Sequence, residues 1–167
     1  MFCMSMAFLP GLTQTKYSVP KLTDIQNYQL AAIQLNSSYL IQISYAKAHK
    51  DKVEEAGKFL GDQLASTWNR SGGFQGLVQG VLYMMVTLVP YGSVEIIEQS
   101  PDSVVCVVAG LFPELKEGGS VYGVTYKEYL RFLDAALSRL AGKFNAEYTQ
   151  NDTDEGLRLI IRKKPSP

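Results

Sequence analysis

The sequence predicts an α+β domain in which helices pack on one side of an antiparallel sheet of about four strands. Three apolar patterns with helical spacing come first, a Val- and Ile-rich strand pair follows, and one further helix precedes a closing strand pair. Runs of helices and hairpins, without strand–helix–strand alternation, are typical of this class. The 167 residues suit a single domain, which we place at residues 21–163, between a tail or arm at 1–20 and a short tail at 164–167.

The first helix is predicted over residues 24–48, where apolar side chains recur three or four residues apart. Nothing ionisable except tyrosine lies between Asp24 and Lys47. Because a helix without a charged face is buried on several sides, we predict a homodimer through residues 24–48. Complete burial of this helix inside one chain would contradict the dimer. Residues 39–45 also alternate as a strand does, so both helix and strand stay open there.

Two further helices follow. Asp51 and Glu54 form a pattern similar to a capping box at the start of the second helix. Gly57 and Gly61 lie four residues apart in it, and because each costs about 1 kcal/mol relative to Ala, we expect another helix backbone to approach closely. Their spacing does not fit a phosphate-binding loop. The third helix, residues 74–88, is wholly uncharged, so we expect it to be central.

The pattern then changes to strands. Residues 93–99 and 103–109 are rich in Val and Ile and are joined by a Ser-Pro-Asp turn, which predicts a hairpin. Residues 110–123 contain four glycines and a proline and read as an irregular loop.

The last elements are a helix and a strand pair. A capping box at Thr125 and Glu128 begins the clearest amphipathic helix of the chain, which we expect to stop at Asn145. Strands at 146–150 and 157–162 close the predicted sheet, and Leu, Leu and Ile alternate with Arg, Ile and Arg along the second of them.

Composition excludes several classes of function. Sixteen basic residues balance sixteen acidic ones, so we expect no nucleic-acid partner. One His and two Cys predict neither a metal site nor a disulfide framework, and this cysteine usage suits a cytoplasmic protein. We expect no transmembrane segment, because the longest uncharged apolar stretch ends at Pro90 before reaching the ~20 residues of a span. The apolar residues 1–12 lack a basic region, which favours an alternative start over a signal peptide.

No catalytic residue is predicted. His49 lies among charged residues at a helix end, and Cys106 lies in mid-strand with no base near it in the sequence. Glu95 and Glu98 are an odd number of residues apart on one strand, so they are expected on opposite faces of the sheet. The sequence leaves the identity of any cofactor open.

Aromatic and methionine residues around the glycine-rich loop predict an apolar ligand pocket. The alternative is that these side chains only fill the core. The predicted lining is Met84, Met85, Cys106, Phe112, Tyr122 and Tyr126.

The layout resembles a superfamily of ligand-binding domains. The resemblance rests on Gly57 and Gly61 in the helix before an uncharged helix and a hairpin, and on the terminal LRLIIRK strand, and it covers residues 50–163. The superfamily contains 4-vinyl-reductase domains, subunits of the TRAPP vesicle-tethering complex and thiazoline-carboxylate hydrolase-like proteins. It implies helices on one side of an antiparallel sheet, dimerisation through early helices, and a hydrophobic or small-molecule pocket. The enzyme-like members tend to carry cysteines where this chain has Phe112 and Pro113.

Two hypotheses on function follow. The preferred one is a non-catalytic binding, scaffold or regulatory domain that acts as a homodimer and holds a small apolar or tetrapyrrole-like molecule. The alternative is an enzyme acting on a small heterocyclic or tetrapyrrole-like substrate, with Cys106, His49 or the loop tyrosines in its site. The enzyme is supported only by the superfamily analogy, which is a weak argument for function, and by the glycine-rich loop as a lid.

Overall fold

The structure, a computed structural model, describes residues 23–68 and 72–165. The predicted tail at 1–20 lies outside the described residues. The described elements are α1 (Asp24–Ala48), α2 (Val53–Thr67), α3 (Gly73–Leu88), β1 (Ser93–Ser100), β2 (Ser103–Ala109), α4 (Pro113–Lys116), β3 (Ser120–Val121), β4 (Val124–Thr125), α5 (Tyr126–Lys143), β5 (Ala146–Thr153) and β6 (Gly156–Lys163).

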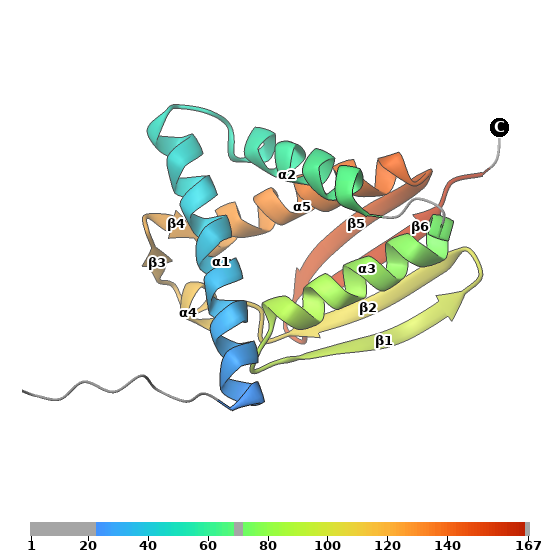
Figure 1. Cartoon of the computed structure of the whole chain (residues 1–167), viewed down its shortest axis with the longest axis horizontal. Helices are drawn as coiled ribbons and strands as arrows, with labels where there is room; N and C mark the ends of the chain where they lie inside the picture. The colour runs from blue at the N-terminus through green and yellow to red at the C-terminus, as the bar shows by residue number, and fades with distance from the viewer. Residues whose placement is uncertain (1–22, 69–71, 166–167) are drawn as a thin grey trace, which may run out of the picture.

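The predicted α+β class is confirmed. β1, β2, β6 and β5 form, in that order, a four-stranded sheet whose neighbours are all antiparallel. The helices lie over one side of this sheet, and α1 crosses the ends of α3 and α5 (Figure 1). The predicted irregular loop at 110–123 contains the four-residue helix α4 and the short strand β3, which pairs with β4 directly after the loop.

The core lies between the sheet and the helices. In β2 and β6 every second residue faces the helices, which explains the alternation seen in the last strand of the sequence. The register places Val104 opposite Ile161, Cys106 opposite Leu159 and Val108 opposite Leu157, and all six side chains are buried.

A β-bulge changes the faces of β1. The register shifts between Ile96 and Glu98, so that Glu95 pairs with Val107 and Glu98 pairs with Val105. Because those two valines are two residues apart, both glutamates lie on the same face of the sheet. The prediction that they lie on opposite faces was wrong, since a counting rule for strands assumes that no residue is inserted.

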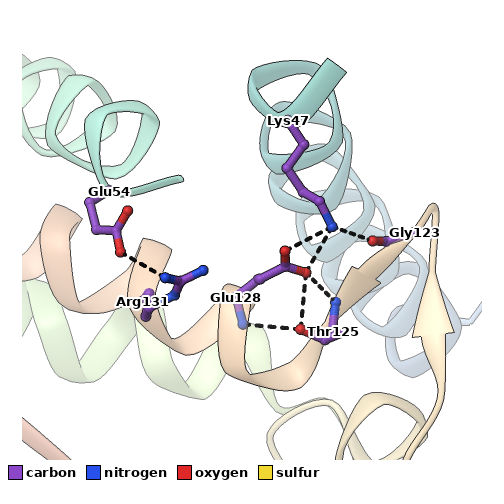
Figure 2. Close-up of polar contacts among 6 residues, drawn as sticks. All are labelled: Lys47, Glu54, Gly123, Thr125, Glu128 and Arg131. Atoms are coloured by element: carbon purple, nitrogen blue, oxygen red, sulfur yellow. Dashed lines mark hydrogen bonds and ion pairs between the residues drawn. The ribbon is translucent and has the colours of Figure 1, made fainter. Parts of the chain in front are cut away.

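α2 packs directly on α5 through its two glycines. A Cβ at Gly57 would overlap the carbonyl oxygen of Phe132, and one at Gly61 would overlap that of Ala136. The close approach of a second helix backbone, predicted from the glycine spacing, is confirmed. Ion pairs flank the contact, including Glu54 with Arg131 at 3.2 Å (Figure 2).

α1 is helical throughout, which resolves residues 39–45 as helix. Thr23 caps it with a complete capping box. Its inner face buries residues at helical spacing, whereas its outer face leaves Leu30, Ile41 and Tyr45 exposed by 44%, 55% and 64%. Burial of side chains three and four residues apart therefore favoured a helix at 39–45 over the strand that the alternation there also allowed. One chain alone does not bury this uncharged helix completely.

Candidate functional site

A pocket opens between α1, the end of α3 and the loop at 110–123. Its volume is about 320 Å³, which lies at the lower end of the range for small-molecule sites. It is lined by Ile33, Asn36, Ser37, Leu40, Leu88, Pro90, Tyr91, Gly110, Phe112, Pro113, Glu114, Val121 and Tyr122. We call this space the ligand pocket.

Two aromatic residues of the pocket hold an unfavourable backbone conformation. Phe112 precedes α4 with φ +48°, and Tyr122 lies in the turn between β3 and β4 with φ +53°. Left-handed backbone costs a residue with a Cβ about 1–2 kcal/mol, and such residues cluster at binding sites, where the surrounding structure maintains the strain. Both strained aromatic residues line the same pocket.

Asn36 supplies a buried amide to the pocket lining. Its side chain is 7% exposed, and its Nδ2 donates a 3.0 Å hydrogen bond to the carbonyl oxygen of Leu88. Its Oδ1 accepts a 2.8 Å hydrogen bond from the hydroxyl of Tyr129. The Tyr129 ring in turn packs edge-on against Phe112, with the ring centroids 5.3 Å apart. The amide therefore joins α1, α3 and α5 behind the pocket.

Lys47 fixes the turn that carries Tyr122. Its Nζ donates to the carbonyl oxygen of Gly123 at 2.6 Å and forms an ion pair with Glu128 at 2.8 Å (Figure 2). Glu128 also accepts a hydrogen bond from the backbone N–H of Thr125 in the capping box of α5. Burial alone would raise the pKa of Glu128, but the hydrogen bonds from Lys47 and Thr125 outweigh it and lower that pKa. The carboxylate therefore stays charged and ties α1 to the loop.

A second contact fixes the other end of the loop. Lys116 of α4 forms a 3.1 Å ion pair with Asp152 of β5 and donates to the carbonyl oxygen of Thr153. Its Nζ also lies 5.8 Å from the ring centroid of Tyr126. Burial first, and the neighbouring Asp152 second, raise the pKa of Tyr126 to about 12.

Only two of the six residues predicted for the pocket are found in its lining. These are Phe112 and Tyr122. Tyr126 does not line the pocket, because its hydroxyl faces Asp152. The remaining three, Met84, Met85 and Cys106, are 9%, 0% and 1% exposed and belong to the core between α3 and the sheet. An uncharged helix such as α3 can either line a pocket or fill the core, so the sequence could not decide between these two roles for Met84 and Met85.

The sequence reasoning missed Asn36, Tyr91 and Glu114. Asn36 is an amide in a helix without charged residues, at a position where the spacing predicts burial. That combination is the signal that was available, since a buried amide requires partners. Tyr91 follows the end of α3 and Glu114 lies in the single turn of α4, and at such positions the sequence pattern does not indicate where a side chain points.

Of the residues named for the enzyme alternative, Cys106 and His49 lie outside the pocket, whereas the loop tyrosine Tyr122 lines it. Burial raises the pKa of the Cys106 thiol to about 11, so the thiol is protonated near neutral pH. The His49 ring packs on Tyr45 with centroids 4.0 Å apart, and its Nδ1 lies 2.9 Å from the carbonyl oxygen of Tyr45. Within residues 23–68 and 72–165, no three His, Cys, Asp or Glu side chains gather as a metal site would require.

A second, more open apolar groove lies between α1 and α2. Its volume is about 550 Å³, and it is lined by Ile41, Gln42, Tyr45, Ala46, Asp51, Glu55, Ala56 and Phe59. The Phe59 side chain is 64% exposed. We call Ile41, Tyr45 and Phe59 the outer patch. In the part of the chain that the structure describes, no helix is long and apolar enough to cross a membrane.

No protein-family model, curated protein sequence or solved structure matches this chain. The fold and the site therefore define the class of protein only by their own geometry: an α+β domain with a strained, aromatic-lined pocket beside a partly exposed apolar helix.

Proposed function

We propose that this protein is a non-catalytic binding domain that holds a small, largely apolar molecule in the ligand pocket. The observation that carries the proposal is the convergence of Phe112 and Tyr122, both in left-handed backbone, on one pocket. Such strain persists only where the surrounding structure maintains it, and strained residues cluster at binding sites. Asn36 gives the mostly apolar lining a fixed polar group, and a few polar groups in an apolar pocket are typical of small-molecule sites.

Native mass spectrometry of the purified protein, with an ultraviolet–visible spectrum of the same sample, tests this proposal. Extra mass that disappears on substituting Ser37→Trp, which adds an indole to the pocket lining at a partly exposed position, supports ligand binding. A Soret band would assign the ligand to the tetrapyrroles. A small apolar ligand is the expected result, because a pocket of about 320 Å³ is at the lower limit for such sites. The same bound mass in both proteins, or none in either, in buffer and after incubation with a cell extract, would contradict the proposal.

We further propose that the protein acts as a homodimer through α1. The outer patch supports this, because Ile41, Tyr45 and Phe59 are exposed by 55%, 64% and 64% on a surface without a charged residue in α1 between Asp24 and Lys47. Exposed apolar patches of this kind mark interaction surfaces. The resemblance to the superfamily of 4-vinyl-reductase domains, with its habit of dimerisation through early helices, belongs to the same proposal.

Light scattering coupled to size-exclusion chromatography tests the dimer. We expect a dimer for the unchanged protein and a monomer for the double variant Ile41→Lys, Tyr45→Glu. Ile97→Lys is the matched control, because Ile97 is 46% exposed on the sheet, away from α1. A monomer for the unchanged protein, or a dimer that only the control variant disrupts, would overturn the proposal.

A further inference from the structure

The charge in the lining of the ligand pocket is negative. Glu114 is the single charged side chain there, and among the described residues no Lys, Arg or His lines the pocket. Within residues 23–68 and 72–165 the Glu114 carboxylate also has no ion-pair partner. A carboxylate that projects at an apolar pocket attracts a cation and repels an anion.

The lysines that hold the loop are engaged away from the pocket. Lys116 pairs with Asp152 at 3.1 Å, and Lys47 pairs with Glu128 at 2.8 Å. Neither side chain lines the pocket. An anionic ligand would therefore find a carboxylate and no free positive charge at this site.

Three aromatic rings are a second feature of the pocket that favours a positively charged ligand. Tyr91, Phe112 and Tyr122 all line the pocket, and Tyr91 and Tyr122 are exposed by 73% and 59%. Because they are exposed, the rings of Tyr91 and Tyr122 lie at the mouth of the ligand pocket, next to solvent. The faces of aromatic rings carry negative potential, and groups of such rings bind ammonium ions. The aromatic rings and the Glu114 carboxylate therefore both favour a cationic ligand.

We propose that the ligand pocket selects organic cations, namely a small amine or quaternary ammonium with an apolar body. The charged group lies among Tyr91, Phe112, Tyr122 and Glu114, and the body contacts the apolar wall formed by Leu40, Leu88 and their neighbours. This inference rests on the proposed function, because it names the ligand class of the same pocket. It goes further by stating the sign of the ligand's charge.

A cation and a neutral molecule of nearly equal shape, together with an anion of the same aromatic ring, test the proposal. Benzyltrimethylammonium is the cation, neopentylbenzene is its neutral carbon isostere, and phenylacetate is the anion. Each is titrated into the full-length ¹⁵N-labelled protein at low ionic strength, and binding is followed by amide chemical shifts in the loop at 110–123. We expect the cation to bind about tenfold more tightly than the isostere and phenylacetate to bind most weakly.

Variants assign the preference to the named groups. Glu114→Gln should weaken binding of the cation by about two- to fivefold, as expected for one partly exposed charge. Tyr122→Leu should weaken it about three- to tenfold, because the apolar bulk stays and the ring face is lost. The affinity for neopentylbenzene should change by less than about twofold in both variants. Glu117→Gln, an exposed carboxylate outside the pocket lining, is the matched control and should change nothing.

The outcomes separate this inference from the proposed function. Equal or tighter binding of neopentylbenzene would overturn the cation preference and leave a pocket for neutral apolar molecules. A preference for the cation that survives Glu114→Gln and Tyr122→Leu unchanged would also overturn it, since the charge would then be recognised elsewhere. Absence of shifts in the loop with all three probes would overturn both the cation preference and the proposed pocket.

Discussion

The hydroxyl of Tyr129 in α5 donates a 2.8 Å hydrogen bond to Oδ1 of Asn36 in α1, 93 residues earlier in the chain. Tyr129 is fully buried and Asn36 is 7% exposed. In the absence of the amide, the hydroxyl would have no partner in an apolar surrounding. This pair therefore determines how α1 sits on α5, and with it the shape of the wall of the ligand pocket.

Removal of the Asn36 amide should destabilise the protein. Asn36→Ala leaves the Tyr129 hydroxyl and the Leu88 carbonyl without their bonds, and we expect a loss of about 1–3 kcal/mol in the free energy of unfolding. Urea denaturation measures it. Combining Asn36→Ala with Tyr129→Phe should cost less than the sum of the single losses, because the hydroxyl is then gone. Ser38→Ala on the exposed side of α1 is the control and should change stability by less than about 0.5 kcal/mol.

Alanine should have opposite effects at two kinds of helical glycine. Gly57→Ala or Gly61→Ala forces a methyl group against an α5 carbonyl and should cost about 1–3 kcal/mol of unfolding free energy. Gly142→Ala, in α5 with no atom within 4 Å of the added methyl group, should raise the free energy of unfolding by about 0.5–1 kcal/mol. Thermal and urea unfolding of the three variants check this. A similar shift at all three positions would show that the α2–α5 contact is looser than described.

Relief of strain in the β3–β4 turn should separate stability from binding. Tyr122 has φ +53° and is 59% exposed, so Tyr122→Gly removes strain and little packing. Left-handed strain of about 1–2 kcal/mol exceeds the entropic cost of glycine, about 0.5–1 kcal/mol, so we expect a small net gain in stability. Ligand binding should weaken in the same variant. Tyr83→Gly, at an exposed position inside α3, should instead lose about 1 kcal/mol.

The fold should lose stability in alkaline solution. Burial raises the pKa of Cys106 from 9.0 to about 11, and burial also raises the pKa values of Tyr129 and Tyr148 well above 10.0. The unfolded chain therefore releases these protons at a lower pH than the folded protein does. Their contribution to stability is fully present below about pH 9 and is lost as the pH rises toward 11.

Urea midpoints measured at several values between pH 8 and pH 11 test this. The midpoint should stay constant at first and then fall steeply. In Cys106→Ala the fall between pH 9 and pH 11 should be shallower than in the unchanged protein, whatever the stability of the variant at pH 8. A midpoint independent of pH up to 11 would contradict the burial of these groups.

The sequence predicted the fold class because the helical and strand periods are clear over most of the domain. Some features depend on residues that are close together in the sequence. These are the capping boxes at Thr23 and Thr125 and the spacing of the paired glycines of α2. The box at Thr125 was predicted from the sequence, and the one at Thr23 was not. The pattern predicted at Asp51 and Glu54 forms no capping box, because the N-cap of α2 is Lys52, which makes no side-chain capping hydrogen bond. The bulge in β1 and the hairpin of β3 and β4 were missed, because both depend on pairing between segments.

The site was predicted only in part for a related reason. Phe112 and Tyr122 were found through the glycine-rich loop, which marks an aromatic region with irregular backbone. Met84 and Cys106 have the same apolar character but are buried in the core. Met84 lies beside the hydroxyl of Tyr39 in α1, and Cys106 lies on the helix-facing side of β2, and only the packing between elements decides these directions. Which of several apolar side chains face an opening is a property of packing between elements, so composition and spacing do not contain it.

The bulge in β1 also bears on how molecules of this protein avoid aggregation. β1 ends the sheet on one side and offers unpaired backbone groups that could template a strand from another chain. The inserted residue kinks that border, and Glu95 and Glu98 place two negative charges on one face beside it. Extension of the sheet from molecule to molecule along β1 is thereby discouraged.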